Sequence, residues 1–358
     1  MKLFELRGTL PSSTKLILEL TGIGVILLVW YIVTAGSEPI VPKGILPSPG
    51  NVILATQDLF VRNNLMKNIL WSIGLNTSGY VEAILISLVF GFLIGLYPFF
   101  RGLFNRPIDA FRFVPLTGVI GLFIVWFGLG ISMKVHFLAF GIWIYMLPVI
   151  VRRIDDVENV YLKTAYTLGA TNFQTIRTVY WPHVMSNFSD DIRVLTAISW
   201  TYIIIIEGIG SQGGIGSLMW KTGIRQGNID KLFAMLFIIV IIGFIQDKFF
   251  VWLDKKLFPF KYQDQAHARS SIIFNSTRWA HIKQLINTGF SLLIALTMLM
   301  FLLNDYLGFL GNGAYLSDSF GDTYWLMAIL MLILSLWLLK DFIFISRKKI
   351  VISKPTGK

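Results

Sequence analysis

The chain has 358 residues, of which 55% are hydrophobic and 14% charged, and it carries a net charge of +11 and no cysteine. This is more apolar surface than a soluble fold of that length can bury, so the composition excludes a soluble protein and predicts an all-α polytopic membrane protein. Without cysteine, disulfides, thiolate metal sites and cysteine nucleophiles are excluded as well.

Eight apolar runs approach the length of about 20 residues that a helix needs to cross a bilayer. They are residues 16–36, 69–97, 113–131, 135–151, 192–210, 232–252, 285–303 and 324–346. With the N-terminus inside, most Lys and Arg residues fall in loops assigned to the cytoplasm, so the positive charge follows membrane topology. We therefore expect cytoplasmic termini, the lipid bilayer as surroundings and no nucleic-acid partner.

The first apolar run is too long for the apolar region of a signal peptide, and it lacks a small-residue cleavage site. We interpret it as a retained first span. The segment that follows is rich in proline up to Pro49 and amphipathic from Asn51. An outside loop and a helix along the membrane surface are expected there, with Val52, Leu59 and Phe60 as its apolar side chains.

Small residues recur every four positions along the second run and therefore share one helix face. They are Gly79, Ala83, Ser87, Gly91 and Gly95. Such a stripe lets another helix backbone approach closely. Packing within the chain is the expected role, and a subunit interface is the alternative.

Two carboxylates stand inside apolar runs, where each costs at least a few kcal/mol unless it meets water or a partner. Glu82 has three open interpretations: a structural hydrogen bond near Asn76 or Ser78, a place in a transport pathway, or proton coupling. Glu207 precedes the segment GIGSQGGIG and is either a helix end at an outer gate or a fixed hydrogen-bond acceptor. The candidates for a pathway or gate are Glu82, Asn76, Ser199, Glu207, Gly213 and Gly214.

Motifs for direct energy use are absent from the sequence. No GxxxxGK[ST] phosphate loop occurs, and the four histidines have no zinc-ligand spacing, so we expect no metal site and no ATP hydrolysis by that route. If transport is driven, another chain supplies the energy.

Between the fourth and fifth runs, residues 155–182 have the pattern of two short helices joined by a glycine, which we call the elbow. Asp155 and Asp156 are expected to cap the first helix, because a helix N-terminus favours acidic side chains. Its apolar residues share one face: Val157, Tyr161, Ala165 and Leu168. Gly169 is placed to end the helix in a left-handed conformation.

Thr171 and Gln174 form a capping box that predicts the second helix of the elbow. Phe173, Ile176 and Tyr180 are expected to face inward. Pro182 lacks a backbone N–H, so it should stop or redirect the helix before the fifth run. A rigid elbow at the cytoplasmic surface offers a contact for a soluble partner, and an ordinary loop with membrane-surface helices is the alternative.

Four elbow residues keep the spacing of a known motif: Ala165, Gly169, Val179 and Pro182. The pattern resembles the EAA loop of binding-protein-dependent ABC importer permeases, EAAxxxGx9IxLP. Lys163 and Thr164 stand where that family usually has Glu and Ala, and Trp181 replaces Leu. The resemblance implies contact with an ATPase through Lys163, Thr164, Ala165, Gly169, Ala170, Phe173 and Pro182.

Further stretches resemble the nitrate, sulfonate, taurine and bicarbonate branch of the same family. They are ILPSPGNVI at 45–53, FRFVPLTGVIGLFIVWFGLGISMKV at 111–135, EGIGSQGGIGSLMW at 207–220 and DKFFVWLDKKLFPF at 247–260. Gly128 and Gly130 allow a tight break between spans, while Gly213, Gly214 and Gly216 permit a re-entrant or sharply turned segment.

The resemblance implies a type I importer permease: a six-helix core followed by two extra C-terminal transmembrane helices. Residues 1–40 would hold a cytoplasmic segment and the first span, 41–262 the permease core with its coupling loop at 155–182, and 263–358 the extension. The outer loop of the extension carries Asp305, Asp318 and Asp322 without Lys or Arg. We expect this loop to be solvated, with contact to a binding protein as the alternative.

The implied protein is a non-catalytic subunit in a bacterial cytoplasmic (inner) membrane. Its implied partners are a second permease copy, cytoplasmic ATPase subunits that bind ATP and Mg, and a periplasmic or lipid-anchored binding protein; the chain itself holds no cofactor. The implied solute is nitrate, a sulfonate such as taurine, or a bicarbonate-like anion. A thiamine-precursor pyrimidine or other heterocycle is an alternative, as is a secondary transporter or a non-transporting scaffold.

Overall fold

The computed structural model describes residues 11–36, 39–210, 212–262, 277–308 and 315–352, and these form helices without strands. The α-helices up to the first break are α1 (Ser12–Thr34), α2 (Pro49–Arg62), α3 (Leu65–Leu96), α4 (Pro98–Phe111), α5 (Leu116–Phe127), α6 (Ile131–Asp155), α7 (Asn159–Thr167), α8 (Asn172–Thr175) and α9 (Trp181–Gly208). They continue with α10 (Ile215–Leu218), α11 (Ile229–Leu257), α13 (Thr277–Leu307), α14 (Tyr315–Phe320) and α15 (Tyr324–Ile352). Two π-helical turns, η1 (Ile176–Tyr180) and η2 (Met219–Ile224), and two 3-10 turns, η3 (Pro259–Tyr262) and η4 (Gly321–Thr323), join them. The predicted all-α fold is confirmed.

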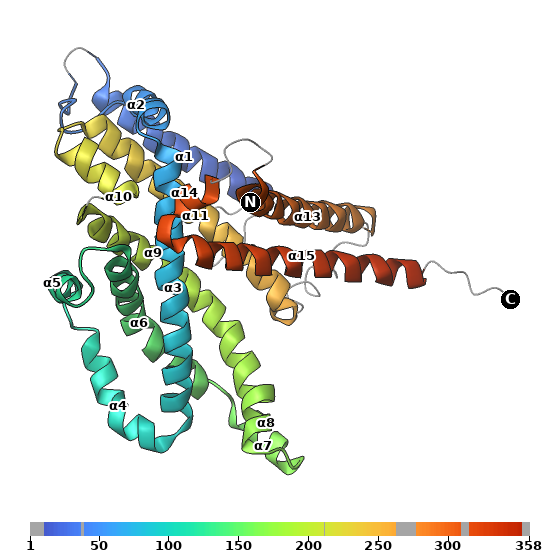
Figure 1. Ribbon diagram of the computed structural model, residues 1–358. Helices are drawn as coiled ribbons and strands as arrows, with labels where there is room; N and C mark the ends of the chain where they lie inside the picture. The colour runs from blue at the N-terminus through green and yellow to red at the C-terminus, as the bar shows by residue number, and fades with distance from the viewer. Residues whose placement is uncertain (1–10, 37–38, 211, 263–276, 309–314, 353–358) are drawn as a thin grey trace.

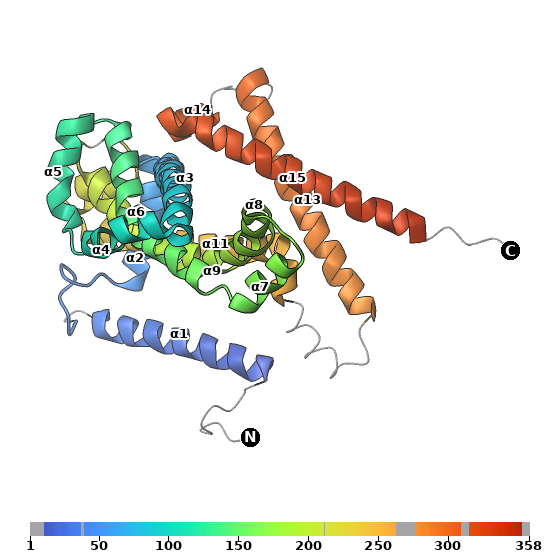
Figure 2. The ribbon, with the colours of Figure 1, turned by 90° about the horizontal axis from the view of Figure 1, so that it is seen from below.

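The core of the molecule is α3 packed along α6, which in turn packs against α9 (Figures 1 and 2). α2 lies at one end of the molecule, and α7 and α8 lie at the other; we call these the α2 end and the elbow end (Figure 1). α3 runs from the first to the second, and α9 runs back. The two ends are therefore joined by the helices of the core.

The stripe of small residues on α3 faces α6. A Cβ added at Gly91 would lie 2.5 Å from Ile150 Cγ2, and one at Gly95 would lie 2.5 Å from Ile154 Cδ1. Likewise, a Cβ at Gly79 would lie 2.7 Å from Leu138 Cβ. Ala83 and Ser87 are fully buried between them. The stripe thus serves helix packing inside this chain.

Six described helices are long and apolar enough to span a membrane, and they include α1, α3, α6, α11 and parts of the C-terminal helices. The uninterrupted span expected at 113–131 is not formed, because α5 covers only Leu116–Phe127. α5 follows α4 after a bend of 108°, and the pair is a broken span or a re-entrant loop. Pro115 precedes α5 and Gly128, with φ +74°, ends it, so the chain turns at both ends.

The expected span at 192–210 is also different in the structure, because it belongs to the longer helix α9. Its apolar part begins only after Arg193. The fourth run is longer than expected as well: α6 starts at Ile131, so Lys134 lies inside a helix and not in a loop. The breaks between spans therefore differ from those that hydropathy indicates.

The surface helix expected after Pro49 is present as α2, with Ser48 accepting a hydrogen bond from the Asn51 backbone N–H. Its apolar face packs into the protein core beside α11, since Val52 and Leu59 are buried. The expectation of a helix whose apolar face meets the membrane is therefore wrong for these two residues.

In the C-terminal extension, α13 packs against α15, and α14 lies against α3. Figure 2 shows α3 almost end-on and α13 and α15 along their lengths, so this pair crosses α3 steeply. Within the predicted outer loop, the Asp305 carboxylate accepts the backbone N–H groups of Leu316 and Ser317 at 2.7 and 3.2 Å, and residues 309–314 lie outside the described residues. The first residues of the predicted extension, 263–276, and the predicted cytoplasmic segment before residue 11 lie outside the described residues.

Candidate functional site

The elbow begins where α6 ends. Asp155 closes α6 and Asp156 is its C-cap, so neither residue caps α7, as the sequence pattern had suggested. Arginines hold both carboxylates at the end of α6: Arg101 lies 2.6 Å from Asp155, and Arg153 lies 3.2 Å from Asp156. The residue before α7 is Glu158, whose side chain makes no capping hydrogen bond.

Gly169 joins the two helices of the elbow with φ +78°, the left-handed conformation that its position predicts. Its N–H donates to the Tyr166 carbonyl at 3.0 Å, and the Ala170 N–H donates to the Ala165 carbonyl at 3.0 Å. These bonds close the end of α7 in the way that a glycine after a helix allows. A side chain at position 169 would meet open space, so the backbone conformation alone favours glycine there.

The second helix of the elbow starts at the predicted capping box. Thr171 Oγ1 accepts from the Gln174 N–H at 3.3 Å, and the Gln174 side chain accepts from the Thr171 N–H at 2.8 Å. From there the chain stays helical through η1 into α9, so Pro182 neither stops nor redirects it. In η1 the Trp181 N–H reaches back to the Ile176 carbonyl, and this wider turn accommodates the proline ring.

The elbow projects from the rest of the molecule, and α7 has no buried residue (Figure 1). Leu168 is 82% exposed and Phe173 72% exposed, so the expectation that Phe173 faces inward is wrong, whereas Ile176 and Tyr180 are half-buried. The large apolar side chains exposed on the elbow are Val160, Tyr161, Tyr166, Leu168, Phe173 and Trp181. Of the other residues expected to contact an ATPase, Lys163 and Thr164 are exposed, whereas Ala165, Ala170 and Pro182 are half-buried.

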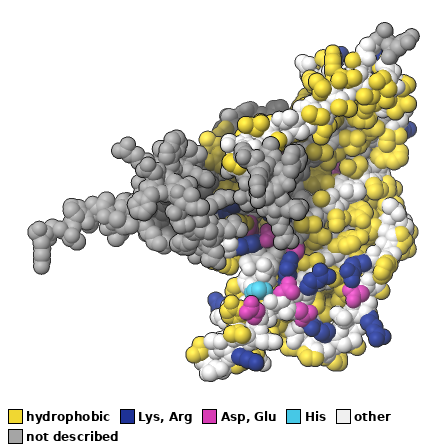
Figure 3. Space-filling view, turned by 180° about the vertical axis from the view of Figure 1, so that it is seen from behind, with side chains coloured by type: hydrophobic (Ala, Val, Ile, Leu, Met, Phe, Trp, Pro, Cys, Tyr) yellow, Lys and Arg dark blue, Asp and Glu magenta, His cyan; other side chains and the backbone are white. Residues whose placement is uncertain are grey.

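Charged residues connect the helix ends behind the elbow. Arg153 donates to both carboxylate oxygens of Asp191 at 2.7 and 2.8 Å, and so joins α6 to α9. Arg193 reaches Asp247 of α11 at 2.8 Å, and Lys261 reaches Asp190 at 2.6 Å. Figure 3 shows Lys, Arg, Asp and Glu side chains gathered at this end of the molecule, below a largely hydrophobic surface.

Asp254 is the buried member of this charged region, at 3% exposure, and it accepts hydrogen bonds from Ser189 and Tyr262. Burial and the neighbouring carboxylate raise the pKa of Tyr262 to about 12, so the phenol stays protonated and donates. Sequence reasoning missed the whole set of ion pairs. The available signal was the recurrence of Asp and Arg near the ends of the apolar runs.

At the other end of α9, Glu207 is fully buried and its carboxylate is surrounded by donors. The Ser72 hydroxyl of α3 lies 2.7 Å from Oε1 and 3.0 Å from Oε2, and the Gly216 N–H donates to Oε2 at 2.8 Å. Ser72 Oγ also accepts from the Ile215 N–H at 2.9 Å. Glu207 and Ser72 together hold the described residues that follow α9, 208–210 and 212–216, which we call the glycine loop.

At two positions of this loop only glycine fits, because atoms of α9 lie where a Cβ would be. Gly214 has φ +97°, and a Cβ there would overlap the Glu207 carboxylate. A Cβ at Gly216 would lie 2.5 Å from the Ile204 carbonyl oxygen. The Gly214 N–H donates to Asn68 Oδ1 at 3.0 Å, so α3 holds the loop at a second point. Of the two open interpretations of Glu207, a fixed hydrogen-bond acceptor matches this geometry.

The remaining pathway candidates lie apart from this loop. Ser199 donates to Asn76 Oδ1 at 3.1 Å, and both residues are buried between α3 and α9. Glu82 does not bond Asn76 or Ser78; its carboxylate lies 2.8 Å from His136 Nδ1 of α6 and is partly exposed. Among the described residues, no three or more His, Cys, Asp or Glu side chains are placed to hold a metal ion.

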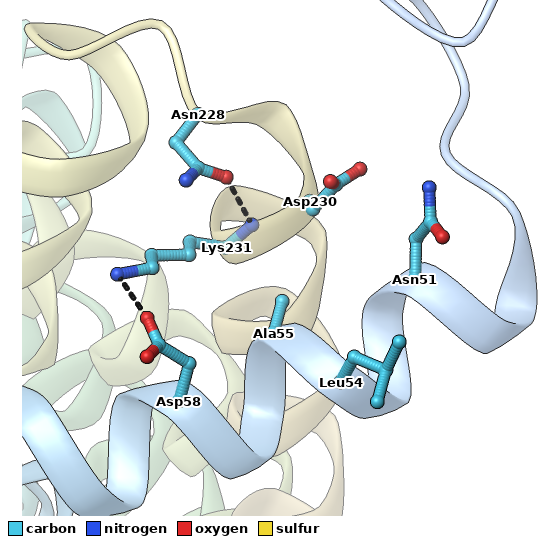
Figure 4. A pocket seen from close by; sticks show the side chains of 7 residues that line it. All are labelled: Asn51, Leu54, Ala55, Asp58, Asn228, Asp230 and Lys231. Carbon is cyan, nitrogen blue, oxygen red and sulfur yellow. Dashed lines mark hydrogen bonds and ion pairs between the residues drawn. The ribbon is translucent and has the colours of Figure 1, made fainter.

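A cavity of about 310 Å³ lies at the α2 end, between α2 and the start of α11 (Figure 4). Lys231 crosses it to Asp58 at 2.6 Å, and its backbone N–H donates to Asn228 Oδ1 at 3.1 Å. The hydrogen bond from Lys231 lowers the pKa of Asp58, which burial alone would raise. Asp58 and Lys231 hold α2 against α11 at this end of the molecule.

Comparison with known proteins gives one family. Residues 83–259 match the model of the family described as binding-protein-dependent transport system inner membrane component. The chain is 24% identical to the taurine transport system permease protein TauC of Escherichia coli strain K12, over 71% of this chain and 94% of that one. It is 26% identical to the putative aliphatic sulfonates transport permease protein SsuC of Bacillus subtilis strain 168, over 66% and 85%. It is 24% identical to the formylaminopyrimidine transport permease protein ThiX of Halalkalibacterium halodurans, over 61% and 86%.

Proposed function

This chain belongs to the family of binding-protein-dependent transport system inner membrane components, and we propose that it is the permease of an ATP-driven importer for a small sulfonate such as taurine. In this proposal two copies of the chain pair in the inner membrane, with both termini in the cytoplasm. A separate ATPase, which binds ATP and Mg, docks at the elbow end. A binding protein delivers the solute at the α2 end.

The exposed apolar surface of the elbow carries this proposal. Leu168 and Phe173 flank the Gly169 turn and lie beyond the apolar spans, so lipid does not cover them in the proposed orientation. Exposed apolar groups on a rigid projection are typical of a protein interface. Lys163 and Thr164, which replace the usual Glu and Ala of the motif, lie on the same exposed helix.

The path of the chain suggests how a movement of the ATPase would reach the membrane. α8, η1 and α9 form one continuous helical segment from the elbow to Glu207, so a shift at Phe173 moves the whole segment. Arg153 links α9 to α6, and the small-residue stripe links α6 to α3. ATP and the loaded binding protein would each stabilise one of two arrangements of these helices, which is alternating access.

Replacing Gly169 tests the coupling role. Gly169→Val forces a β-branched residue into the left-handed region, which costs roughly 1–3 kcal/mol of backbone strain without any clash. We expect the variant to reach the membrane but to lose co-purification with the ATPase. The measurement is the amount of ATPase recovered with the tagged permease.

Gly169→Asn is the matched control, because asparagine tolerates the left-handed conformation, and it should retain the ATPase. Gly102→Val, in α4 at the same end of the molecule and with open space around it, should also behave as the unchanged protein. Equal recovery of the ATPase with Gly169→Val and Gly169→Asn would count against the coupling role.

The substrate class is tested on the partner binding protein. Similarity to TauC and SsuC favours a sulfonate, so taurine or alkanesulfonates should raise the thermal unfolding temperature of that protein. Nitrate and bicarbonate are the other anions to compare. A shift with pyrimidines alone would favour the second candidate, a pyrimidine permease, which the similarity to ThiX supports.

A secondary transporter and a non-transporting scaffold would differ from an importer permease in what solute uptake requires. Uptake into proteoliposomes should require the ATPase, ATP and the binding protein together if the chain is an importer permease. Uptake driven by an ion gradient alone would favour a secondary transporter. No uptake under either condition, with the complex intact, would favour a scaffold.

A further inference from the structure

Trp71, near the start of α3, lies between two glycines from distant parts of the chain. On one side is Gly213 of the glycine loop, where an added Cβ would lie 3.1 Å from Trp71 Cε2. On the other side is Gly321 of the C-terminal extension, where an added Cβ would overlap the far edge of the same indole ring. The extension and the glycine loop therefore meet through one side chain.

One turn further along α3, the extension makes a second close contact. A Cβ added at Gly74 would lie 2.5 Å from Thr323 Oγ1 and 2.8 Å from Phe320 Cδ1. Leu316, Phe320 and Thr323 are buried, so α14 and η4 are seated on the protein. Gly321 has φ +55°, which lets the chain turn at this contact.

α14 is held in place by a contact within the extension. The Asp305 carboxylate at the end of α13 accepts two backbone N–H groups at the start of α14, and this orients the short helix. Trp71 Nε1 is buried and has no hydrogen-bond partner among the described residues. The indole is thus positioned by packing between the two glycines and not by a polar contact.

The contact lies next to the buried carboxylate. Ser72, the residue after Trp71, is the hydroxyl donor to Glu207 and the acceptor for Ile215. A shift of Trp71 would therefore disturb both the packing of Gly213 and the hydrogen bonds of the glycine loop. This is a connection between the extension and the loop that the permease core would not have alone.

We infer that the C-terminal extension is a brace for the glycine loop: α14 and η4 press on Trp71, and Trp71 positions the loop at Gly213 and Glu207. Trp71 is then a positioning residue. The packing of α14 and η4 on Trp71 does not depend on transport. Its meaning for gating rests on the proposed function.

Cysteine cross-linking tests the seat of the extension, because the chain has no cysteine of its own. A Cβ at position 74 lies 2.5 Å from Thr323 Oγ1, close enough for a disulfide. We expect Gly74→Cys combined with Thr323→Cys to form a disulfide on mild oxidation in detergent. Gly74→Cys combined with Tyr315→Cys, an exposed position, is the control and should leave both thiols free. Free thiols in both pairs would overturn the docked geometry.

Thiol labelling tests the brace. The single thiol in Ser217→Cys, which is buried in α10 directly after the glycine loop, is labelled with a maleimide in detergent, where both faces of the membrane protein are accessible. Adding Phe320→Ala, which removes the ring over Gly74, should increase the labelling rate several-fold. Adding Leu336→Ala, at an exposed position of α15, should leave the rate unchanged. Equal rates in all three proteins would overturn the bracing role.

Trp71→Phe replaces the indole by a smaller aromatic ring between the two glycines, so it should also increase the labelling of Ser217→Cys. This second variant covers the case in which Phe320→Ala fails to fold. None of these measurements uses the ATPase, the binding protein or a solute. A failure of the proposed function would therefore leave them unchanged, and a failure of the brace would leave the ATPase co-purification unchanged.

Discussion

At the scale of the residue, Ser72 has an unusual share of the interactions at the glycine loop. Its single hydroxyl donates to Glu207 and accepts from the Ile215 N–H, so one side chain satisfies a buried carboxylate and a buried backbone group. Leaving a buried polar group without a partner costs more than the hydrogen bond contributes when it is present. The loop is therefore sensitive to this one position.

Ser72→Ala should lower the free energy of unfolding by about 1–3 kcal/mol, because both Glu207 and Ile215 lose a partner. Ser78→Ala is the matched control on the same helix, since Ser78 Oγ only donates to the Gly74 carbonyl. Its effect should be clearly smaller. Thermal unfolding of the two variants in detergent gives the comparison, and equal losses would contradict the importance given to the loop contacts.

At the scale of the element, the contact between α3 and α6 depends on glycines, whose lack of a side chain lets the two helices approach closely. Gly91 faces Ile150 so closely that an added Cβ would lie within 2.5 Å of its Cγ2. Small residues allow such backbone approach between helices in membranes, where burial of apolar surface from water does not drive association. The small-residue stripe thus stabilises the pair by letting the surfaces of α3 and α6 fit together closely.

Gly91→Leu should destabilise the protein by about 1–3 kcal/mol through overpacking against Ile150. Gly243→Leu in α11, where an added Cβ meets nothing within 4 Å, is the control and should change the unfolding temperature little. The readout is thermal stability together with solute uptake. If Gly91→Leu leaves both unchanged, the packing of α3 on α6 is looser than the structure indicates.

At the scale of the whole molecule, the ion pairs behind the elbow join helices that would have to move together. Arg153 pairs with Asp191 through two hydrogen bonds. The exposed fraction of the side chain is 30% for Arg153 and 19% for Asp191. Two-point contact between Arg and carboxylate fixes direction as well as distance. The pair therefore fixes α6 against α9, and in the proposed importer it would transmit movement from the elbow.

In the proposed importer, Arg153→Ala should reduce ATP-driven uptake several-fold while the ATPase still co-purifies, because the elbow is intact and only the contact between α6 and α9 is lost. Arg152→Ala, at the exposed neighbouring position, should have little effect. Exchanging the charges, with Arg153→Asp and Asp191→Arg in one protein, should restore part of the uptake. If Arg152→Ala lost as much uptake as Arg153→Ala, the positive charge at this end would matter and not the ion pair between α6 and α9.

The amino-acid sequence was sufficient for the membrane class, the family, and the glycine turn and capping box of the elbow. Composition requires a lipid-embedded fold, and the left-handed Gly169 and the capping box at Thr171 depend on neighbours within a few residues, so their pattern is visible along the chain. The two extra helices after the permease core were visible for the same reason, as uninterrupted apolar runs.

Contacts between distant segments were decided only by the tertiary structure. Glu82 with His136, Arg153 with Asp191 and Trp71 with Gly321 each join residues whose separation along the chain carries no signal of their meeting. The same holds for the exposed side of the elbow, because helical spacing places Leu168 and Phe173 on a face without saying what covers that face. Local hydrogen bonds depend on residues that are close in the sequence, and composition can be read from the sequence directly. Packing depends on which helices lie side by side, and the sequence does not state this.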